Sequence, residues 1–185
     1  MTDPIRAAVA EAVHVPLLIV LGGLPATGKT AIARGVARDL TAVHLRIDSI
    51  EEALRKAGVT DVVDHGYRVA YALAVDNLRL GHWVIADAVN PLALTREAWR
   101  AVGEAGDARV VEIEVVCSDA RLHERRVAER APDIAGQVLP TWREVLDRHY
   151  EPWEPAPTLR IDTATGGAAD WVRQALTAIV SARRV

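Results

Sequence analysis

The sequence predicts an α/β protein whose parallel sheet of five strands is covered by helices on both faces. Short apolar segments alternate with amphipathic helical patterns along the chain, which is typical of successive βαβ units. The expected strands are residues 15–21, 42–47, 82–86, 108–117 and 158–161. Because crossovers between parallel strands are right-handed, ligands should bind where the carboxyl ends of these strands meet.

Helical spacing and capping residues predict the elements between and around the strands. The expected helices are residues 29–40, 49–58, 67–78, 95–106, 118–131, 141–150 and 168–183. Ser49 and Thr141 each open a capping box, while Thr95 and Ser118 are expected as simple N-caps.

Length and composition favour one globular domain. A chain of 185 residues fits a single domain over residues 1–185, with residues 118–140 as a small lid. The net charge of −3 argues against a nucleic-acid or acidic-lipid partner. The only cysteine, Cys117, excludes an intrachain disulfide and cysteine metal clusters. The first residues lack a signal-peptide pattern and the apolar run at 15–21 cannot cross a bilayer, so we expect a cytoplasmic protein without a membrane partner.

A phosphate-binding loop is predicted between the first strand and the first helix. The segment matches GxxxxGK[ST], and a strand before it and a helix after it are the context that this motif requires. Its glycines permit backbone N–H groups to converge on phosphates, to which the helix adds its positive end. Lys29 would reach the β- and γ-phosphates of ATP, and Thr30 would ligate Mg²⁺. The residues expected to bind nucleotide are Gly23, Leu24, Pro25, Ala26, Thr27, Gly28, Lys29, Thr30 and Ala31.

Two acids stand at strand ends that should converge near the phosphates. Asp48 follows the second expected strand and Asp87 the third. One would activate an acceptor hydroxyl as general base, and the other would hold the Mg²⁺ shell; we assign the first role to Asp48 and the second to Asp87. Asn90 either reaches a substrate pocket or forms a turn before Pro91, and the sequence leaves both open.

An arginine-rich helix follows the fourth expected strand. Arg121 and Arg125 are four residues apart, as are Arg126 and Arg130, so each pair shares a helix face. Arginines on a mobile segment can neutralise the charge that develops during phosphoryl transfer. The alternative is a solvated face that pairs with neighbouring glutamates. We favour lid arginines, with Arg126 and Arg130 as the catalytic pair.

Together these segments resemble the P-loop kinase group, and specifically the small AAA_33-type kinase-like ATPases. Polynucleotide kinases, gluconate kinases, chloramphenicol phosphotransferases and zeta-toxin kinases are similar in layout. The resemblance rests on GGLPATGKT at 22–30, RIDSIEEALR at 46–55, VIADAVNP at 84–91, CSDARLHERRVAER at 117–130 and LRIDTA at 159–164.

The resemblance implies a P-loop NTPase three-layer sandwich with sheet order 2-3-1-4-5. It also implies that Asp48 is the acceptor-activating aspartate, that Arg126 and Arg130 are paired lid arginines, and that Thr163 lies in the loop beside the adenine. One position departs from the pattern: many relatives carry a phosphate-binding arginine three residues after the acceptor aspartate, where this chain has Glu51.

Three functions remain open, and the first is favoured. They are an ATP-dependent phosphotransferase acting on a hydroxyl of a small molecule, a regulatory nucleotide-binding ATPase, and a polynucleotide 5′-kinase. A switch protein has no use for a base such as Asp48. Because Glu51 would repel a phosphate, we expect an uncharged or cationic acceptor. The aromatic residues near the expected acceptor site, which would form either its wall or part of the core, are Tyr67, Tyr71, Trp142 and Trp153.

Overall fold

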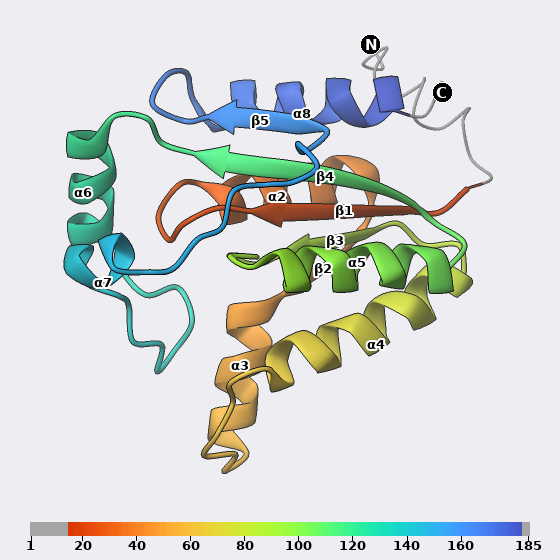
Figure 1. The fold of residues 1–185 in the computed structure, drawn as a ribbon, viewed down its shortest axis with the longest axis horizontal. Coiled ribbons are helices and arrows are strands. Elements are labelled where there is room, and N and C mark those ends of the chain that lie inside the picture. Colours follow the sequence, from red (N-terminus) through yellow and green to blue (C-terminus); the bar gives the residue numbers. More distant parts are fainter. Residues whose placement is uncertain (1–14, 183–185) are drawn as a thin grey trace.

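The computed structural model describes residues 15–182 (Figure 1). Its strands form one parallel sheet in the order β2-β3-β1-β4-β5. The α/β fold and the strand order implied by the resemblance are therefore confirmed. Each predicted strand overlaps an observed one, with ends that shift by one or two residues. The observed strands are β1 (Leu17–Gly22), β2 (Val43–Arg46), β3 (Val84–Asp87), β4 (Arg109–Val116) and β5 (Leu159–Asp162).

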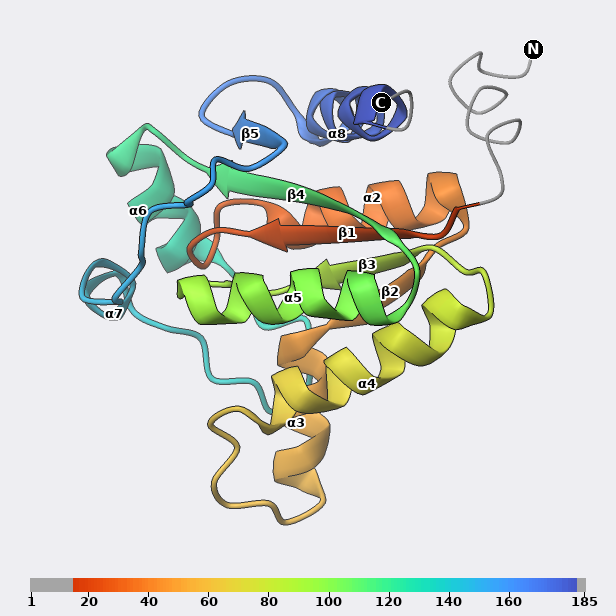
Figure 2. The same ribbon diagram turned by 45° about the vertical axis from the view of Figure 1, so that its right-hand side comes forward.

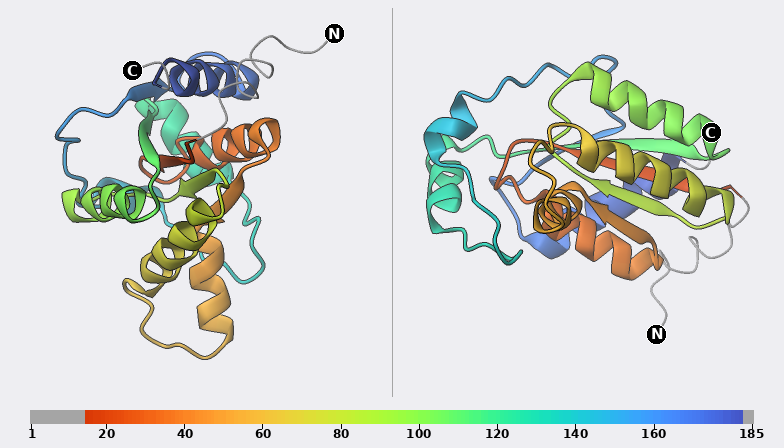
Figure 3. Two further views of the ribbon diagram at one scale, coloured as in Figure 1. Left: turned by 90° about the vertical axis from the view of Figure 1, so that its right-hand side faces the viewer. Right: turned by 90° about the horizontal axis from the view of Figure 1, so that it is seen from below.

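Helices cover both faces of the sheet (Figures 2 and 3). The helices α2 and α8 pack on one face, and α4 and α5 pack on the other. The helices α6 and α7 stand beyond the carboxyl ends of the strands, and α3 continues directly from β2 (Figure 1). The bounds are α2 (Lys29–Leu40), α3 (Ile47–Lys56), α4 (His65–Arg79), α5 (Ala93–Ala105), α6 (Ala120–Glu129), α7 (Trp142–Leu146) and α8 (Ala168–Ala182).

The central strand β1 organises two apolar layers. All six of its residues are buried, and its side chains alternate between the two faces of the sheet. Leu17, Ile19 and Leu21 pack in the layer under α2 and α8, whereas Leu18 and Val20 pack in the layer under α4 and α5. Because β1 is buried on both faces, its residues form an uninterrupted apolar run. The chain leaves the sheet where this run ends.

The start of α3 differs from the prediction and changes the setting of Asp48. The capping box predicts Ser49 as the N-cap, but the helix begins at Ile47 with Arg46 as its N-cap residue. Ile47 is buried against the apolar layer of α4, which draws the chain into the helix directly after β2. Asp48 therefore lies in the first turn of α3, where the helix N-terminus stabilises a carboxylate.

The starts of α5 and α6 and the end of α7 differ from the prediction. Thr95 lies in the first turn of α5 and is not its N-cap. The N-cap of α6 is Asp119 in place of Ser118, because the Asp119 carboxylate accepts a backbone hydrogen bond from the first turn. The capping box at Thr141 is confirmed, but α7 ends at Leu146 and is shorter than predicted. Across residues 15–182, no helix combines the length and apolar character needed to span a membrane.

Candidate active site

A pocket of about 970 Å³ opens at the carboxyl ends of β1, β2 and β3. Its walls come from the loop before α2, the first turns of α3 and α5, and the segment from α6 to α7. The predicted site residues that line it are Pro25, Ala26, Gly28, Lys29, Thr30, Ala31, Asp48, Glu51, Asp87, Arg126 and Arg130. The pocket thus brings together most of the residues selected from the sequence.

The backbone of the phosphate-binding loop, residues 23–30, has the torsions that its glycines were expected to allow. Gly23 has φ 139° and Gly28, the N-cap of α2, has φ 102°. A Cβ at residue 23 would lie 2.0 Å from the carbonyl oxygen of Val115, so no other residue fits there without a shift. Ala26 also has a positive φ, of 62°. A loop of this shape at a helix N-terminus is suited to an anion.

Two side chains from distant parts of the chain hold the loop from outside. The Thr163 hydroxyl donates to the carbonyl oxygen of Thr27 at 2.8 Å. The Nε2 atom of His123, in α6, lies 2.8 Å from the carbonyl oxygen of Pro25, a contact that requires the Nε2–H tautomer. Thr163 is completely buried and does not line this pocket, and its hydroxyl holds the loop; its predicted place beside the adenine stays a prediction.

The side chain of Lys29 is hydrogen-bonded within the loop of residues 23–30. Its ammonium donates to the carbonyl oxygen of Leu24 at 2.7 Å, and the residue is only 8% exposed. Burial lowers the pKa of Lys29 to about 8, against the opposing charges of Asp87 and Asp48, and the positive charge of Arg130 lowers it further. An anion that binds here would raise the pKa of Lys29 and favour its charged form.

Asp87, the last residue of β3, is buried and ionised. Its Oδ2 atom lies 3.2 Å from Nε2 of His44, on the neighbouring strand β2. Burial alone would raise the pKa of Asp87, but the hydrogen bond to His44, the charge of Lys29 and the nearby Thr30 hydroxyl together hold it below its usual range. Asp87 and Thr30 thus offer one carboxylate and one hydroxyl to the pocket. This donor set fits Mg²⁺, which usually takes few protein ligands and completes its shell with water and substrate phosphates.

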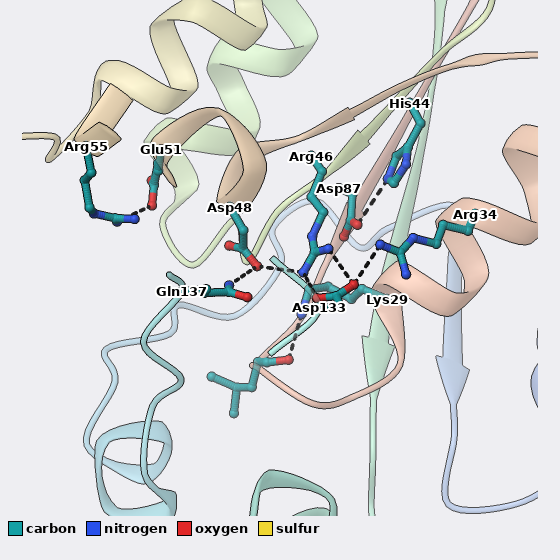
Figure 4. Close-up of polar contacts among 11 residues, drawn as sticks. Lys29, Arg34, His44, Arg46, Asp48, Glu51, Arg55, Asp87, Asp133 and Gln137 are labelled. Atoms are coloured by element: carbon teal, nitrogen blue, oxygen red, sulfur yellow. Dashed lines mark hydrogen bonds and ion pairs between the residues drawn. The ribbon is translucent and has the colours of Figure 1, made fainter. Parts of the chain in front are cut away.

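Asp48 and Glu51 lie one helical turn apart on α3, in different surroundings (Figure 4). The Oδ2 atom of Asp48 accepts a hydrogen bond from Nε2 of Gln137 at 3.2 Å and lies 3.5 Å from Nη2 of Arg46. The side chain of Asp48 is 41% exposed. Glu51 instead pairs with Arg55 at 3.2 Å, and burial raises its pKa against the effect of that arginine. The charge of Glu51 is therefore compensated within α3.

A family model described as an AAA domain, AAA_33, matches residues 18–152. The chain belongs to this family. The resemblance inferred from its motifs is thereby confirmed. No curated protein matches the AAA_33 chain.

Solved structures similar to this AAA_33 protein cover nearly the whole chain. APS kinase CysC of Mycobacterium tuberculosis, in complex with AMPPNP and APS, has a TM-score of 0.68 and 20% identity over 89% of this chain and 98% of its own. A gluconokinase from Sinorhizobium meliloti 1021 has a TM-score of 0.64 and 18% identity, with 92% and 95% covered. Chaetomium thermophilum Kti12, in complex with ADP-AlF3, has a TM-score of 0.66 and 22% identity, with 89% and 98% covered. These similarities establish the fold of P-loop kinases.

The four arginines of the predicted lid fall into two groups in this AAA_33 protein. Arg121 and Arg125 are exposed and do not line the pocket, as in a solvated helix face. Arg126 and Arg130 line it. Arg126 is also engaged inside the protein, since it donates to the hydroxyl and to the carbonyl oxygen of Thr163, both at 2.9 Å. Arg130 is the C-cap of α6 and lowers the pKa of the loop lysine.

Asn90 does not line the pocket, and its role as a substrate ligand stays a prediction. It is completely buried and has a φ of 48°, which asparagine tolerates better than most residues. Its Nδ2 donates to the carbonyl oxygen of Leu21 at 2.8 Å, and its Oδ1 accepts from Nε1 of Trp99 at 3.0 Å. Both ends of the amide are used to tie β1 to α5.

The predicted aromatic wall is reduced to one residue. Tyr67 lines the pocket, whereas the other three do not. Tyr71 packs edge-to-face on the indole of Trp99, and Trp142 packs in the same way on the ring of His123. Trp153 is buried beneath the guanidinium of an arginine in α5. For these three residues the interpretation as packing residues holds.

Several polar residues of the pocket were missed by the sequence reasoning. Arg46 could have been found, because it ends the second strand and lies in register with Asp87. Arg34 lies one helical turn after Thr30, which is a weak signal by itself. Asp133 gave no signal, because its place depends on the path of the chain between α6 and α7.

Proposed function

We propose that this chain is an ATP-dependent phosphotransferase that moves the γ-phosphate to a hydroxyl of a small molecule. The observation that carries this proposal is that Asp48 shares one pocket with Lys29 and lies close enough for its charge to raise the pKa of that lysine. Asp87 is the carboxylate placed beside Thr30, which leaves the second carboxylate, Asp48, for another role. Asp48 is suited to a hydroxyl that approaches the phosphate bound by Lys29.

The proposed reaction uses these side chains in a fixed order. Residues 23–30 and the ammonium of Lys29 would bind the β- and γ-phosphates. Asp48 would accept the proton of the acceptor hydroxyl. At the same time the oxygen of that hydroxyl would form a bond to the γ-phosphorus. The bond from that phosphorus to the β-bridging oxygen breaks, and ADP leaves with the electron pair. Arg130, and Arg126 if it leaves Thr163, would meet the negative charge on the transferred group.

Thr30 and Asp87 would hold the Mg²⁺ that accompanies ATP. The ion held by these two residues would supply positive charge that offsets part of the charge of the phosphates. The contribution of the chain is to keep Asp87 ionised, through the hydrogen bond of His44, and to hold its carboxylate beside the hydroxyl of Thr30.

We further propose that the chain is one kinase-like domain in which residues 118–140 act as the lid. The location of α6 and α7 beyond the carboxyl ends of the strands supports this, as does the lining of the pocket by Arg126, Arg130 and Gln137. The kinase fold of the similar structures also supports a phosphotransferase.

An acceptor screen tests this function. ADP release would be measured with Mg–ATP and a panel of sugars, sugar acids, nucleosides, aminoglycosides and 5′-hydroxyl oligonucleotides, for the wild-type protein and for Asp48→Asn. We expect at least one small hydroxyl compound to stimulate ADP release through Asp48. Stimulation by oligonucleotides alone, lost steeply with salt, would support a polynucleotide kinase. Slow ADP release that no acceptor changes would support a regulatory ATPase.

A further inference from the structure

Asp133, in the segment between α6 and α7, is held by two arginines of the pocket (Figure 4). Nη1 and Nη2 of Arg46 donate to Oδ2 and Oδ1 of Asp133 at 2.8 and 2.9 Å, in the bidentate geometry of strong guanidinium–carboxylate pairs. Nη2 of Arg34 donates to the same Oδ2 at 2.7 Å. The Arg46 guanidinium beside it holds the pKa of Asp133 well below its usual range. Asp133 is therefore an anion at neutral pH.

Arg34 and Arg46 form an arginine pair, and the hydrogen-bonding capacity of Arg46 is not fully used. The side chain of Arg46 is only 5% exposed at the end of β2, and its buried Nε has no hydrogen-bond partner within residues 15–182. Buried polar atoms of this kind are rare and call for a ligand or a water molecule. The two guanidinium groups share the two oxygens of Asp133, and Arg46 has a second, longer ion pair with Asp48 at 3.5 Å. A tetrahedral oxyanion has more acceptor oxygens and a larger charge, and would match the pair better.

The arginine pair lies between the phosphate-binding loop and Asp48 in the same pocket. Arg34 comes one helical turn after Thr30, and Arg46 lies 3.5 Å from Asp48, the proposed base. A group bound between the arginines would therefore lie beside Asp48, on the side away from Glu51, which is paired with a residue of its own helix (Figure 4). The compensated charge of Glu51 removes the reason to expect an uncharged or cationic acceptor.

We propose that Arg34 and Arg46 form a subsite for an oxyanion of the acceptor substrate, which Asp133 fills when the acceptor is absent. This inference rests on the proposed phosphotransferase function. The acceptor class is then a hydroxyl compound that also carries a phosphate or sulfate group. The side chains of Arg34 and Asp133 are 50% and 36% exposed, so exchange of one anion for another does not require the core to open.

Displacement of Asp133 is coupled to access to the base. Gln137, four residues further along, donates to Asp48, and the ammonium of Lys56 donates to the carbonyl oxygen of Ala135. The segment 133–137 thus contacts both the arginine pair and the proposed base. An acceptor whose anion replaces Asp133 would lift this segment and free Asp48 to receive its hydroxyl.

Sulfate and inorganic phosphate are the probes for this subsite. The phosphate-binding loop is first filled with a non-hydrolysable ATP analogue and Mg²⁺, and anion binding is then measured by calorimetry. If Asp133 fills the site in about nine molecules of ten, Asp133→Asn should bind sulfate about tenfold more tightly than the wild type. Arg46→Gln and Arg34→Gln, each in the Asp133→Asn background, should lose that gain. Arg34 is half-exposed, so its variant serves even if Arg46→Gln fails to fold.

The matched control is Asp147→Asn, which removes the same charge from an exposed ion pair with Arg143. It should leave sulfate affinity unchanged. Equal sulfate affinity of Asp133→Asn and the wild type would overturn the proposal, and so would a gain that survives loss of Arg34 and Arg46. Abolition of sulfate binding by the ATP analogue would also overturn it, because the pair would then serve the γ-phosphate.

A second experiment compares hydroxyl compounds that differ only in an anionic group, such as a sugar phosphate and its parent sugar. We expect phosphorylation to favour the anionic member, and Arg34→Gln to raise its KM at least about tenfold while leaving the neutral member unchanged. Sulfate binding as expected without any phosphorylation would contradict only the proposed function. Phosphorylation of neutral compounds that Arg34→Gln does not change would contradict only the subsite.

Discussion

The ammonium of Lys29 donates to the carbonyl oxygen of Leu24 at 2.7 Å, within the loop that precedes α2. The hydroxyl of Thr27 donates to the same oxygen at 2.9 Å. The loop backbone thus fixes the position of the Lys29 ammonium in the absence of a bound phosphate. Burial depresses its pKa to about 8, so the loop carries a cation whose charge depends on pH close to neutrality.

Replacement of Lys29 by alanine should abolish most of the stabilisation by ATP. A ligand present at one hundred times its dissociation constant raises the free energy of unfolding by about 2.7 kcal/mol. Thermal unfolding with and without Mg–ATP measures this shift. The chain has only two lysines, so Lys56→Ala, outside the pocket lining, is the natural control and should keep the full shift. Equal ATP affinity for wild type and Lys29→Ala would refute the phosphate-binding role.

The affinity for Mg–ATP should fall as pH rises through about 8. In the unliganded protein Lys29 is charged below this pKa and neutral above it, whereas bound phosphates favour the charged form and raise its pKa. Binding then takes up a proton, and the dissociation constant should rise by up to about tenfold per pH unit above pH 8. Calorimetry from pH 7 to 9.5 tests this. Lys29→Arg, which remains charged, should show a flat profile; a wild-type profile that is equally flat contradicts the prediction.

The sheet and the loop could be predicted because their signals are local. A buried central strand requires a continuous apolar run, and the GxxxxGKT spacing specifies the turn that follows β1. Asp48 and Asp87 were found because strand ends converge at one edge of a parallel sheet. In each case a short segment carries enough information to fix both its structure and its place.

The rest of the site depends on contacts between distant segments. Asp133 meets Arg46 only because the chain between α6 and α7 returns over the pocket, and no spacing in the sequence encodes that path. Asn90 and Thr163 lie beside the site but use their side chains on buried backbone carbonyls. Such hydrogen bonds compete with ligand contacts, and a sequence pattern does not indicate which of the two a polar side chain makes.

Asp48→Asn should keep ATP affinity but lose transfer to the acceptor. Asparagine preserves the shape of the side chain and removes the base, whose contribution to such reactions is typically about a hundred- to ten-thousand-fold. Steady-state kinetics with an acceptor from the screen would measure kcat, and calorimetry would measure the dissociation constant of Mg–ATP. Asp61→Asn, on an exposed loop, is the control and should change neither. Turnover close to that of the wild type would mean that Asp48 only stabilises the N-terminus of α3 and is not a base.

Arg126 and Arg130 should differ in what they contribute. Arg130→Ala should lower kcat by about a hundredfold or more while ATP binding changes little, because the charge that it meets grows in the transition state. Arg126→Ala should also lower the free energy of unfolding, by about 1 kcal/mol, since it loses two hydrogen bonds to Thr163. Kinetics and urea unfolding separate the effects, and exposed Arg125→Ala should show neither. Weakened ATP binding with normal kcat would make both arginines ground-state binders.

Asn90→Ala should destabilise the fold without changing how the folded protein binds its substrates. The change leaves the buried carbonyl oxygen of Leu21 and the indole N–H of Trp99 without their partner, at a cost of about 1–3 kcal/mol for each group. Alanine also tolerates the φ of 48° less well than asparagine. Urea unfolding should therefore give a loss of about 3 kcal/mol. Asn77→Ala removes an exposed amide that bonds to the preceding helical turn, and should cost well under 1 kcal/mol. Unchanged stability of Asn90→Ala together with a raised KM for the acceptor would support Asn90 as a substrate ligand.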